Sequence, residues 1–231
     1  MLGALAVACA RESVVPPVII AVTMGETSVV LRLAAPHADP PTPWTALPDA
    51  RRWMRADGAE IAASEAAGLR SIGPGGLVAV GLSGRPGTFV DLSRARGIIA
   101  LEGDRAARAE VAHRWIDEYT RAPWSKDRTV GLVGLRQLST EGTVDLTVRD
   151  VVAAIASGSA GLALLAEFPP GEDGADLRRA LESLACRWTV VTLGGTGPAR
   201  WTFTAATDGT VTSEIFPADA APPLFAEELT R

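Results

Sequence analysis

From Gly97 onward the sequence alternates between short apolar runs and amphipathic helical segments, and this alternation constrains the fold more than any other feature. Strands that alternate with helices are typical of a parallel sheet with crossover helices. The expected strands are residues 98–101, 129–135, 162–168 and 189–193. Beyond them, residues 201–205 and 210–216 alternate across Asp208-Gly209, which predicts a C-terminal β-hairpin.

The helices expected between these strands have recognisable starts. Asp104 is expected to cap a helix that runs to about Arg121. Its apolar face is formed by Val111, Ala112, Trp115, Ile116 and Tyr119. Its solvent-exposed face is expected to carry two ion pairs, Glu110 with Arg114 and Asp117 with Arg121. A second helix starts with a capping box of Thr147 and Asp150, and a third starts at Asp173 or Asp176.

The N-terminal third is expected to be rich in β-structure. A short helix over residues 4–11 precedes a hairpin of residues 18–23 and 28–33, an edge strand over 51–55, and a second hairpin of 77–82 and 88–92. The glycine cluster at 73–76 suggests a boundary between an N-terminal β-rich lobe (1–76) and an α/β domain (77–231). The fold class is therefore α/β. The first ten residues are read either as an amphipathic helix or as the trimmed start of a longer chain.

Composition excludes several functions. The net charge is −5 and the basic residues are scattered along the sequence, so no nucleic-acid partner is expected. No apolar window is long enough to predict a membrane span. The two cysteines, Cys9 and Cys186, are read as buried thiols, and neither histidine has further ligands at metal-binding spacing. We therefore expect no metal and no cofactor.

The place to search for a ligand is the turn after the first parallel strand, where a helix N-terminus can face an anion. Glu102, Asp104 and Arg105 lie there, and Glu167 ends a later strand, so these four residues are the candidates for a crevice site. A phosphate loop needs several glycines, a lysine and a hydroxyl residue, whereas residues 101–105 contain a single glycine. Two carboxylates would also repel a phosphate. Asp104 is therefore interpreted as a helix cap and Glu167 as a solvated strand end.

Nucleophilic catalysis is not indicated. His113 is expected on a helix and His37 in a proline-rich crossing, and neither has a serine or cysteine partner at a recognisable spacing. The sequence contains no Gly-x-Ser-x-Gly elbow. The six tryptophans are spread singly, which favours core anchors over a sugar-stacking platform. No catalytic residue is assigned.

Residues 77–135 resemble the soluble part of large actinobacterial membrane proteins that carry a LysM or transcriptional-activator-like domain. Residues 15–216 also look like a distant, degenerate FtsK/EccC-type motor ATPase, in which a hairpin with a "G.DL" turn precedes the phosphate-loop strand. The family's phosphate loop would fall on residues 102–108, where its lysine and hydroxyl are absent. Its acidic pair would fall on Ala166 and Glu167, where one acid remains.

The resemblance implies an ATPase-like domain that lacks the residues required for ATP hydrolysis. Three functions are considered. The first is a non-catalytic interaction or scaffold domain of an envelope-associated bacterial assembly, bound to a protein partner or to copies of itself. The second is a nucleotide-binding or hydrolytic enzyme with a non-standard loop at Glu102–Arg105. The third is a glycan or small-molecule receptor. The expected location is the cytoplasm, as the soluble part of a membrane-associated protein.

Overall fold

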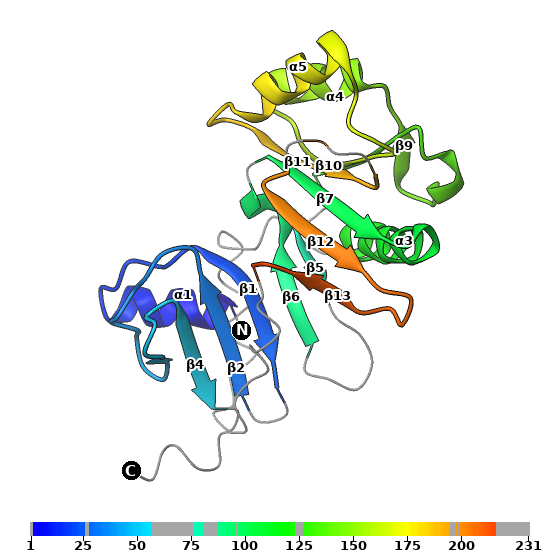
Figure 1. Cartoon of the computed structure of the whole chain (residues 1–231). Coiled ribbons are helices and arrows are strands. Elements are labelled where there is room, and N and C mark those ends of the chain that lie inside the picture. Colours follow the sequence, from blue (N-terminus) through cyan, green and yellow to red (C-terminus); the bar gives the residue numbers. More distant parts are fainter. Residues whose placement is uncertain are drawn as a thin grey trace.

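The computed structural model describes residues 2–25, 28–56, 76–80, 87–95, 97–122, 127–194, 197 and 199–215. These residues form two sheets, one antiparallel and one mostly parallel with helices on both faces (Figure 1). The predicted α/β class is confirmed. Among the described residues, no helix is both long and apolar enough to cross a bilayer.

The first sheet has six strands in the order β3-β4-β2-β1-β6-β5. Their bounds are β1 Ile19–Met24, β2 Ser28–Leu33, β3 Thr45–Ala46, β4 Arg52–Ala56, β5 Leu77–Ala79 and β6 Gly87–Asp91. Both expected hairpins form, as β1 with β2 and β5 with β6, and β6 also pairs with β1. The division at residues 76 and 77 stays a prediction, and this sheet takes strands from both sides of it.

The first sheet has its own apolar cluster beside α1 (Leu2–Arg11). Trp53 on β4 is fully buried, and its indole Nε1 donates to the backbone oxygen of His37 at 2.7 Å. The sequence placed residues 51–55 at an edge of the sheet, and this was wrong, because β3 hydrogen-bonds to the outer side of β4. A strand of two residues inside a proline-rich crossing has too little pattern to be recognised.

The second sheet has seven strands in the order β13-β12-β7-β11-β10-β8-β9. Their bounds are β7 Ile98–Gly103, β8 Thr129–Val133, β9 Thr143–Asp145, β10 Ala160–Leu165, β11 Arg187–Thr192, β12 Trp201–Ala205 and β13 Val211–Ser213. Only β13 runs antiparallel to its neighbour, β12, which confirms the C-terminal hairpin. The strand β12 joins the sheet in parallel to β7.

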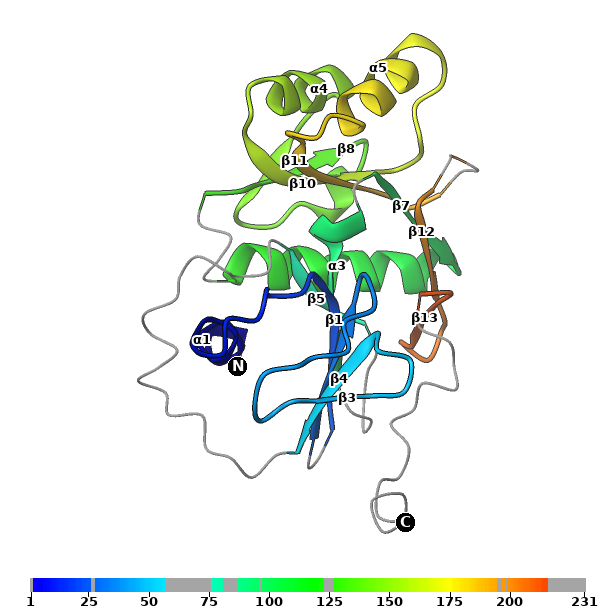
Figure 2. The ribbon, with the colours of Figure 1, turned by 90° about the vertical axis from the view of Figure 1, so that its left-hand side faces the viewer.

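Helices cover the two faces of this sheet (Figure 2). The helix α3 (Arg105–Arg121) packs on one face, and α4 (Val148–Ala156) and α5 (Gly171–Leu181) pack on the other. Side chains of β10 alternate between the faces as a strand requires: Leu162 and Leu164 contact the α3 side, and Ala163 and Leu165 contact α4 and α5. A strand buried on both faces explains why β10 is apolar throughout.

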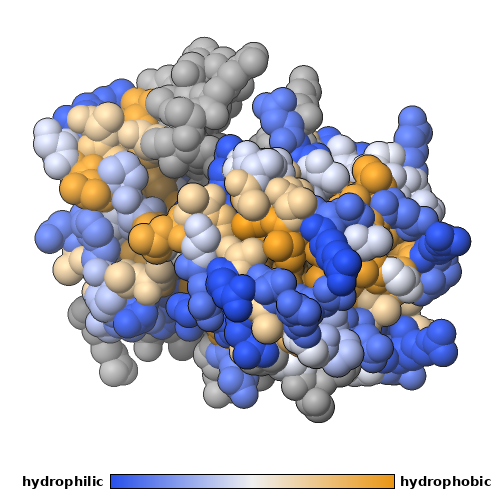
Figure 3. All heavy atoms as spheres, turned by 90° about the horizontal axis from the view of Figure 1, so that it is seen from above, coloured by the Kyte–Doolittle hydropathy of each residue, from blue (hydrophilic) through white to orange (hydrophobic). Residues whose placement is uncertain are grey.

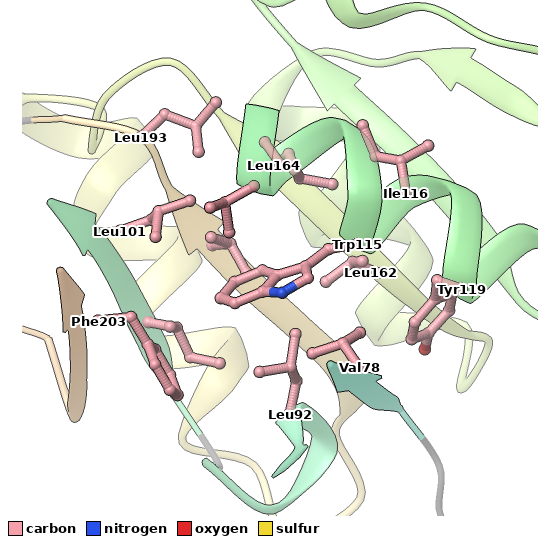
Figure 4. Close-up of a cluster of buried hydrophobic side chains, with 14 of the residues drawn as sticks. Val78, Leu92, Leu101, Trp115, Ile116, Tyr119, Leu162, Leu164, Leu193 and Phe203 are labelled. Carbon is pink, nitrogen blue, oxygen red and sulfur yellow. The ribbon is translucent and has the colours of Figure 1, made fainter. Parts of the chain in front are cut away.

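The two sheets meet at α3. One continuous cluster of buried side chains includes Val78 and Val90 of the first sheet, Trp115 of α3, and Leu101 and Phe203 of the second sheet (Figure 4). The Trp115 indole Nε1 donates to the backbone oxygen of Ala79 at 2.9 Å, so α3 is tied to β5 by a hydrogen bond as well as by packing. Both sheets therefore share a core through α3.

Several boundaries differ from the sequence prediction. The third helix begins at Gly171 after Pro170, before either aspartate that was expected to start it. The strand β9 and the short 3-10 helices η1 (Leu92–Ala95) and η3 (Arg136–Leu138) were not expected. The predicted turn at 83–87 lies largely outside the described residues, and the glycines at 73–75, Trp124 and the expected loose or helical end at 218–231 lie wholly outside them.

Candidate site at the carboxyl ends of the parallel strands

The strand order defines where a ligand site would lie in this sheet. From β7 the chain crosses through α3 to β8, on one side, whereas from β11 it passes to β12 on the other side of β7. The strands β7 and β11 are neighbours, and the connections that leave them run in opposite directions along the sheet. In open α/β sheets the ligand crevice lies at such a switch point, outside the carboxyl ends of the strands. Here those ends are Gly103 and Thr192.

The connection from β7 to α3 consists of one residue, Asp104, as the sequence predicted for the helix cap. Its Oδ1 accepts from the amides of Ala106 at 2.8 Å and Ala107 at 3.2 Å. These amide bonds lower the pKa of the Asp104 carboxyl, because they stabilise the ionised form. The free amides that a phosphate would need are thus already bonded to a carboxylate of the chain itself.

Arg108 closes the space between the strand ends. Its Nη1 donates to the backbone oxygen of Leu193, directly after β11. A side chain built on Gly194 would lie 3.1 Å from the same Nη1 and 3.4 Å from the backbone oxygen of Ala166, directly after β10. The guanidinium of Arg108 therefore joins the first turn of α3 to the end of β11, and Gly194 leaves little space between this group and the end of β10.

Gly103 brings β12 close to the same turn. Its φ is +105°, and a Cβ atom at this position would lie 2.1 Å from the backbone oxygen of Ala205. Gly103 and Ala205 are register partners in the parallel pair of β7 and β12. The last residue of β7 must therefore be glycine, both for its backbone angle and for the close approach of β12.

The other candidate residues are dispersed along this edge. Glu102 is exposed and opposite Thr204 of β12, and Arg105 is the exposed first residue of α3. Glu167 is exposed two residues after β10, and β11 lies between β10 and β7. Within the described part of the chain, no hydrogen bond or ion pair joins Glu167 to the other three. The four remain candidates by position, and no shared geometry for catalysis connects them.

Arg108 is the residue at this crevice that the sequence analysis missed. It lies in the first turn of α3, where an arginine alone reads as a solvated helix residue. Its acceptor lies 85 positions away in the sequence, on a strand whose place beside β7 follows only from the sheet order. A local sequence pattern contains no signal for such a bond.

The remaining side chains that could carry chemistry are structural or separate. Trp44, Trp53, Trp115 and Trp188 are buried, as expected for core anchors. His37 packs edge-on against Trp53 with ring centroids 5.0 Å apart. His113 is half-buried on α3. The expected ion pair of Asp117 with Arg121 forms at 3.2 Å, whereas Glu110 and Arg114 form none among the described residues.

Asp104→Ala is expected to lower the thermal stability of the protein, because the amides of Ala106 and Ala107 lose their acceptor. Asp104→Asn keeps an acceptor and should lose less. Since the folded-state pKa of Asp104 is lowered, its ionic contribution is present at neutral pH and disappears as the pH falls through that lowered pKa. Melting curves of the wild type and Asp104→Asn should therefore differ at pH 7 and converge in acid. A constant difference at every pH would contradict this assignment.

Comparisons with known proteins give a distant likeness to a solved structure. No protein family matches the sequence, and no curated protein matches it. A solved structure of the pCW3 conjugation coupling protein TcpA, in its monomer form with ATPγS, is similar over 87% of this chain and 81% of that chain. The identity is 9% and the TM-score is 0.38. At this level the fold of the present chain is defined by its own strand order and register alone.

Proposed function

We propose that this chain is a non-catalytic interaction or scaffold domain with an ATPase-like architecture, which acts in an envelope-associated bacterial assembly. The observation that carries the proposal is the closed turn after β7. Asp104 takes up the first amides of α3, and Arg108 bonds across the strand ends to the Leu193 carbonyl. A phosphate chain would have to displace both groups.

A protein partner is supported by the apolar groups on the surface of the chain. The face seen from above has hydrophobic residues grouped among hydrophilic ones (Figure 3). Burial of apolar groups favours association of proteins. The location in an envelope-associated assembly is part of the proposal, and it follows from the expected resemblance of residues 77–135 alone. The partner is either a different protein or a second copy of this chain.

The competing function is nucleotide binding through the non-standard turn Glu102–Arg105. It requires room for phosphates beside Asp104, and it requires a cation to offset the exposed carboxylates of Glu102 and Asp104. Arg105 is the adjacent cation. The glycan-receptor alternative has less support, because four tryptophans are buried and the half-buried Trp201 packs edge-on against Phe203.

ATP, ADP and GTP with Mg²⁺ are expected to undergo no turnover, and any shift of the melting temperature that they cause should be the same in the wild type, in Asp104→Asn and in Arg108→Ala. A ligand at one hundred times its Kd would add about 2.7 kcal/mol of stability. For a chain of this size such a gain raises the melting temperature by about 5–10 °C, which differential scanning fluorimetry detects easily. Asp104→Asn tests the turn directly, because it removes the carboxylate charge and keeps the cap. Nucleotide binding by the wild type that Asp104→Asn or Arg108→Ala alters would overturn the proposal.

A further inference from the structure

Four arginines gather at the opposite edge of the parallel sheet, where its strands begin. Arg128, Arg187 and Arg200 lie at or directly before the first residues of β8, β11 and β12. Arg94 belongs to η1, which leads into β7. Because parallel strands all begin at the same edge, positions far apart in the sequence are brought together there. The basic residues are scattered along the sequence, yet these four are not scattered in space.

These arginines line a cavity of about 500 Å³. The other lining residues include Ser183, whose hydroxyl group can donate a hydrogen bond, and the loop after α5 with Glu182 and Cys186. Ser93 also lines the cavity, but its hydroxyl donates to Oδ1 of Asp91 at 2.6 Å. Pockets for small ligands fall in the range of about 300–1,000 Å³. The cavity has the size for a small molecule and lies away from the crevice at the carboxyl ends of the strands.

The charges in the cavity are unbalanced. Arg94 is 41% exposed and has a partner, since its Nε lies 3.2 Å from Oδ2 of Asp91. Arg128 donates to the neutral hydroxyl of Tyr119 at 3.1 Å. In the described part of the chain, the side chains of Arg187 and Arg200 have no hydrogen bond or ion pair.

The remaining groups do not restore the balance. Glu182 is the one acid among the lining residues. The Cys186 thiol adds no negative charge, because burial raises its pKa. The backbone itself places Arg200: its amide donates to the Ile98 carbonyl at 2.7 Å, and its side-chain carbons lie over Gly97. The local excess of positive charge is therefore a fixed property of the fold, although the chain as a whole has a net charge of −5.

We propose that this cavity binds a small phosphate-bearing ligand, held chiefly by Arg187 and Arg200, with Arg94 and Arg128 completing the cationic wall. Guanidinium groups match phosphate oxygens with paired hydrogen bonds and remain charged at every physiological pH. Trp188 also lines the cavity, but it is 4% exposed and its Nε1 is bonded to Ser159 Oγ at 3.1 Å. It offers no free ring for a base, so the anionic group of the ligand carries recognition.

This site is independent of the proposed scaffold function. It uses the amino ends of the strands, whereas nucleotide binding by the turn Glu102–Arg105 would use their carboxyl ends. The two can therefore be tested separately. The net charge of the chain and the concave shape of the site favour a small anion over a nucleic-acid backbone, which needs an extended basic surface.

Inorganic tripolyphosphate is a suitable probe, measured by isothermal titration calorimetry at low ionic strength. We expect saturable binding of one tripolyphosphate per chain, with an affinity that falls as salt is added. The double variant Arg187→Gln/Arg200→Gln should lose at least about tenfold in affinity, because it removes the two unpaired guanidinium groups. The single variants should each show part of this loss, and they keep the test valid if the double variant misfolds.

The matched control is Arg149→Gln/Arg179→Gln, which removes the same charge from α4 and α5. Arg149 and Arg179 are exposed and pair with Asp173 and Asp176, away from the cavity. Its affinity for tripolyphosphate should stay within about twofold of the wild type, because screened charges at a distance contribute little. Absence of saturable binding, or an equal loss in both double variants, would overturn the proposal. If ATP binds the Arg187→Gln/Arg200→Gln variant as well as it binds the wild type, the ATP site is outside this cavity, and the carboxyl-end crevice becomes the candidate.

Discussion

Trp115→Ala is expected to lower the free energy of unfolding by about 3–5 kcal/mol, which is the usual cost of emptying a buried tryptophan site. Trp115 is fully buried in the cluster that both sheets share, and its ring packs edge-on against Phe203 with centroids 5.5 Å apart (Figure 4). The cavity would open between α3, β5 and β12. Single domains have a free energy of unfolding of only about 5–15 kcal/mol. Urea denaturation should therefore show that this variant has lost a large part of its stability.

Trp115→Phe is the control that separates packing from hydrogen bonding. Phenylalanine keeps most of the apolar ring, but it cannot donate to the Ala79 carbonyl as the indole Nε1 does at 2.9 Å. The expected cost is about 1–3 kcal/mol, from the smaller ring and the carbonyl left unpaired. If Trp115→Ala and Trp115→Phe cost the same, the hydrogen bond dominates. If Trp115→Ala costs less than about 1 kcal/mol, the sheets do not share a cooperative core.

Elements specified by neighbouring residues could be predicted from the sequence. Thr147 and Asp150 form the expected capping box, and the buried face of α3 is the one that the helical period indicates. The hairpin across Asp208-Gly209 also forms, since its turn residues are adjacent. In each case the residues that carry the signal lie within a few positions or a few turns of one another, so a local pattern is sufficient.

Long-range pairings could not be predicted. The strand β6 pairs with β1, where the hydroxyl groups of Thr23 and Thr88 lie 3.3 Å apart across 65 positions. The same limit applies to the parallel addition of β12 beside β7. Strand pattern identifies which residues are buried, but it does not select among partners with similar apolar faces.

The candidate site shows the same division between local and distant contacts. Its location followed from the first parallel strand, and the Asp104 cap followed from the residues beside it. The Arg108 contact with Leu193 depends on the sheet order, as does the gathering of the four arginines at the opposite edge. When strand order brings side chains together, their spacing in the sequence does not predict the contact.

Gly103→Ala is expected to destabilise the protein by at least about 3 kcal/mol. Its φ of +105° is unfavourable for any residue with a Cβ atom, and the new methyl group would lie 2.1 Å from the Ala205 carbonyl oxygen. That oxygen belongs to the backbone of β12, so relief requires the strand itself to move. Urea denaturation would measure the loss, and hydrogen exchange should report it first at the pairs between β7 and β12.

Gly158→Ala is the matched control, because Gly158 has a φ of +77° but open space around the position of a Cβ atom. It carries the backbone penalty without the clash, so its cost should be about 1–2 kcal/mol. The difference between the two variants measures how tightly β12 packs on the turn before α3. Equal costs would mean that β12 moves away easily from the new methyl group. The turn before α3 would then have space for a ligand beside it. A larger cost for Gly103→Ala means that a tight strand contact occupies the place where a phosphate loop would need space.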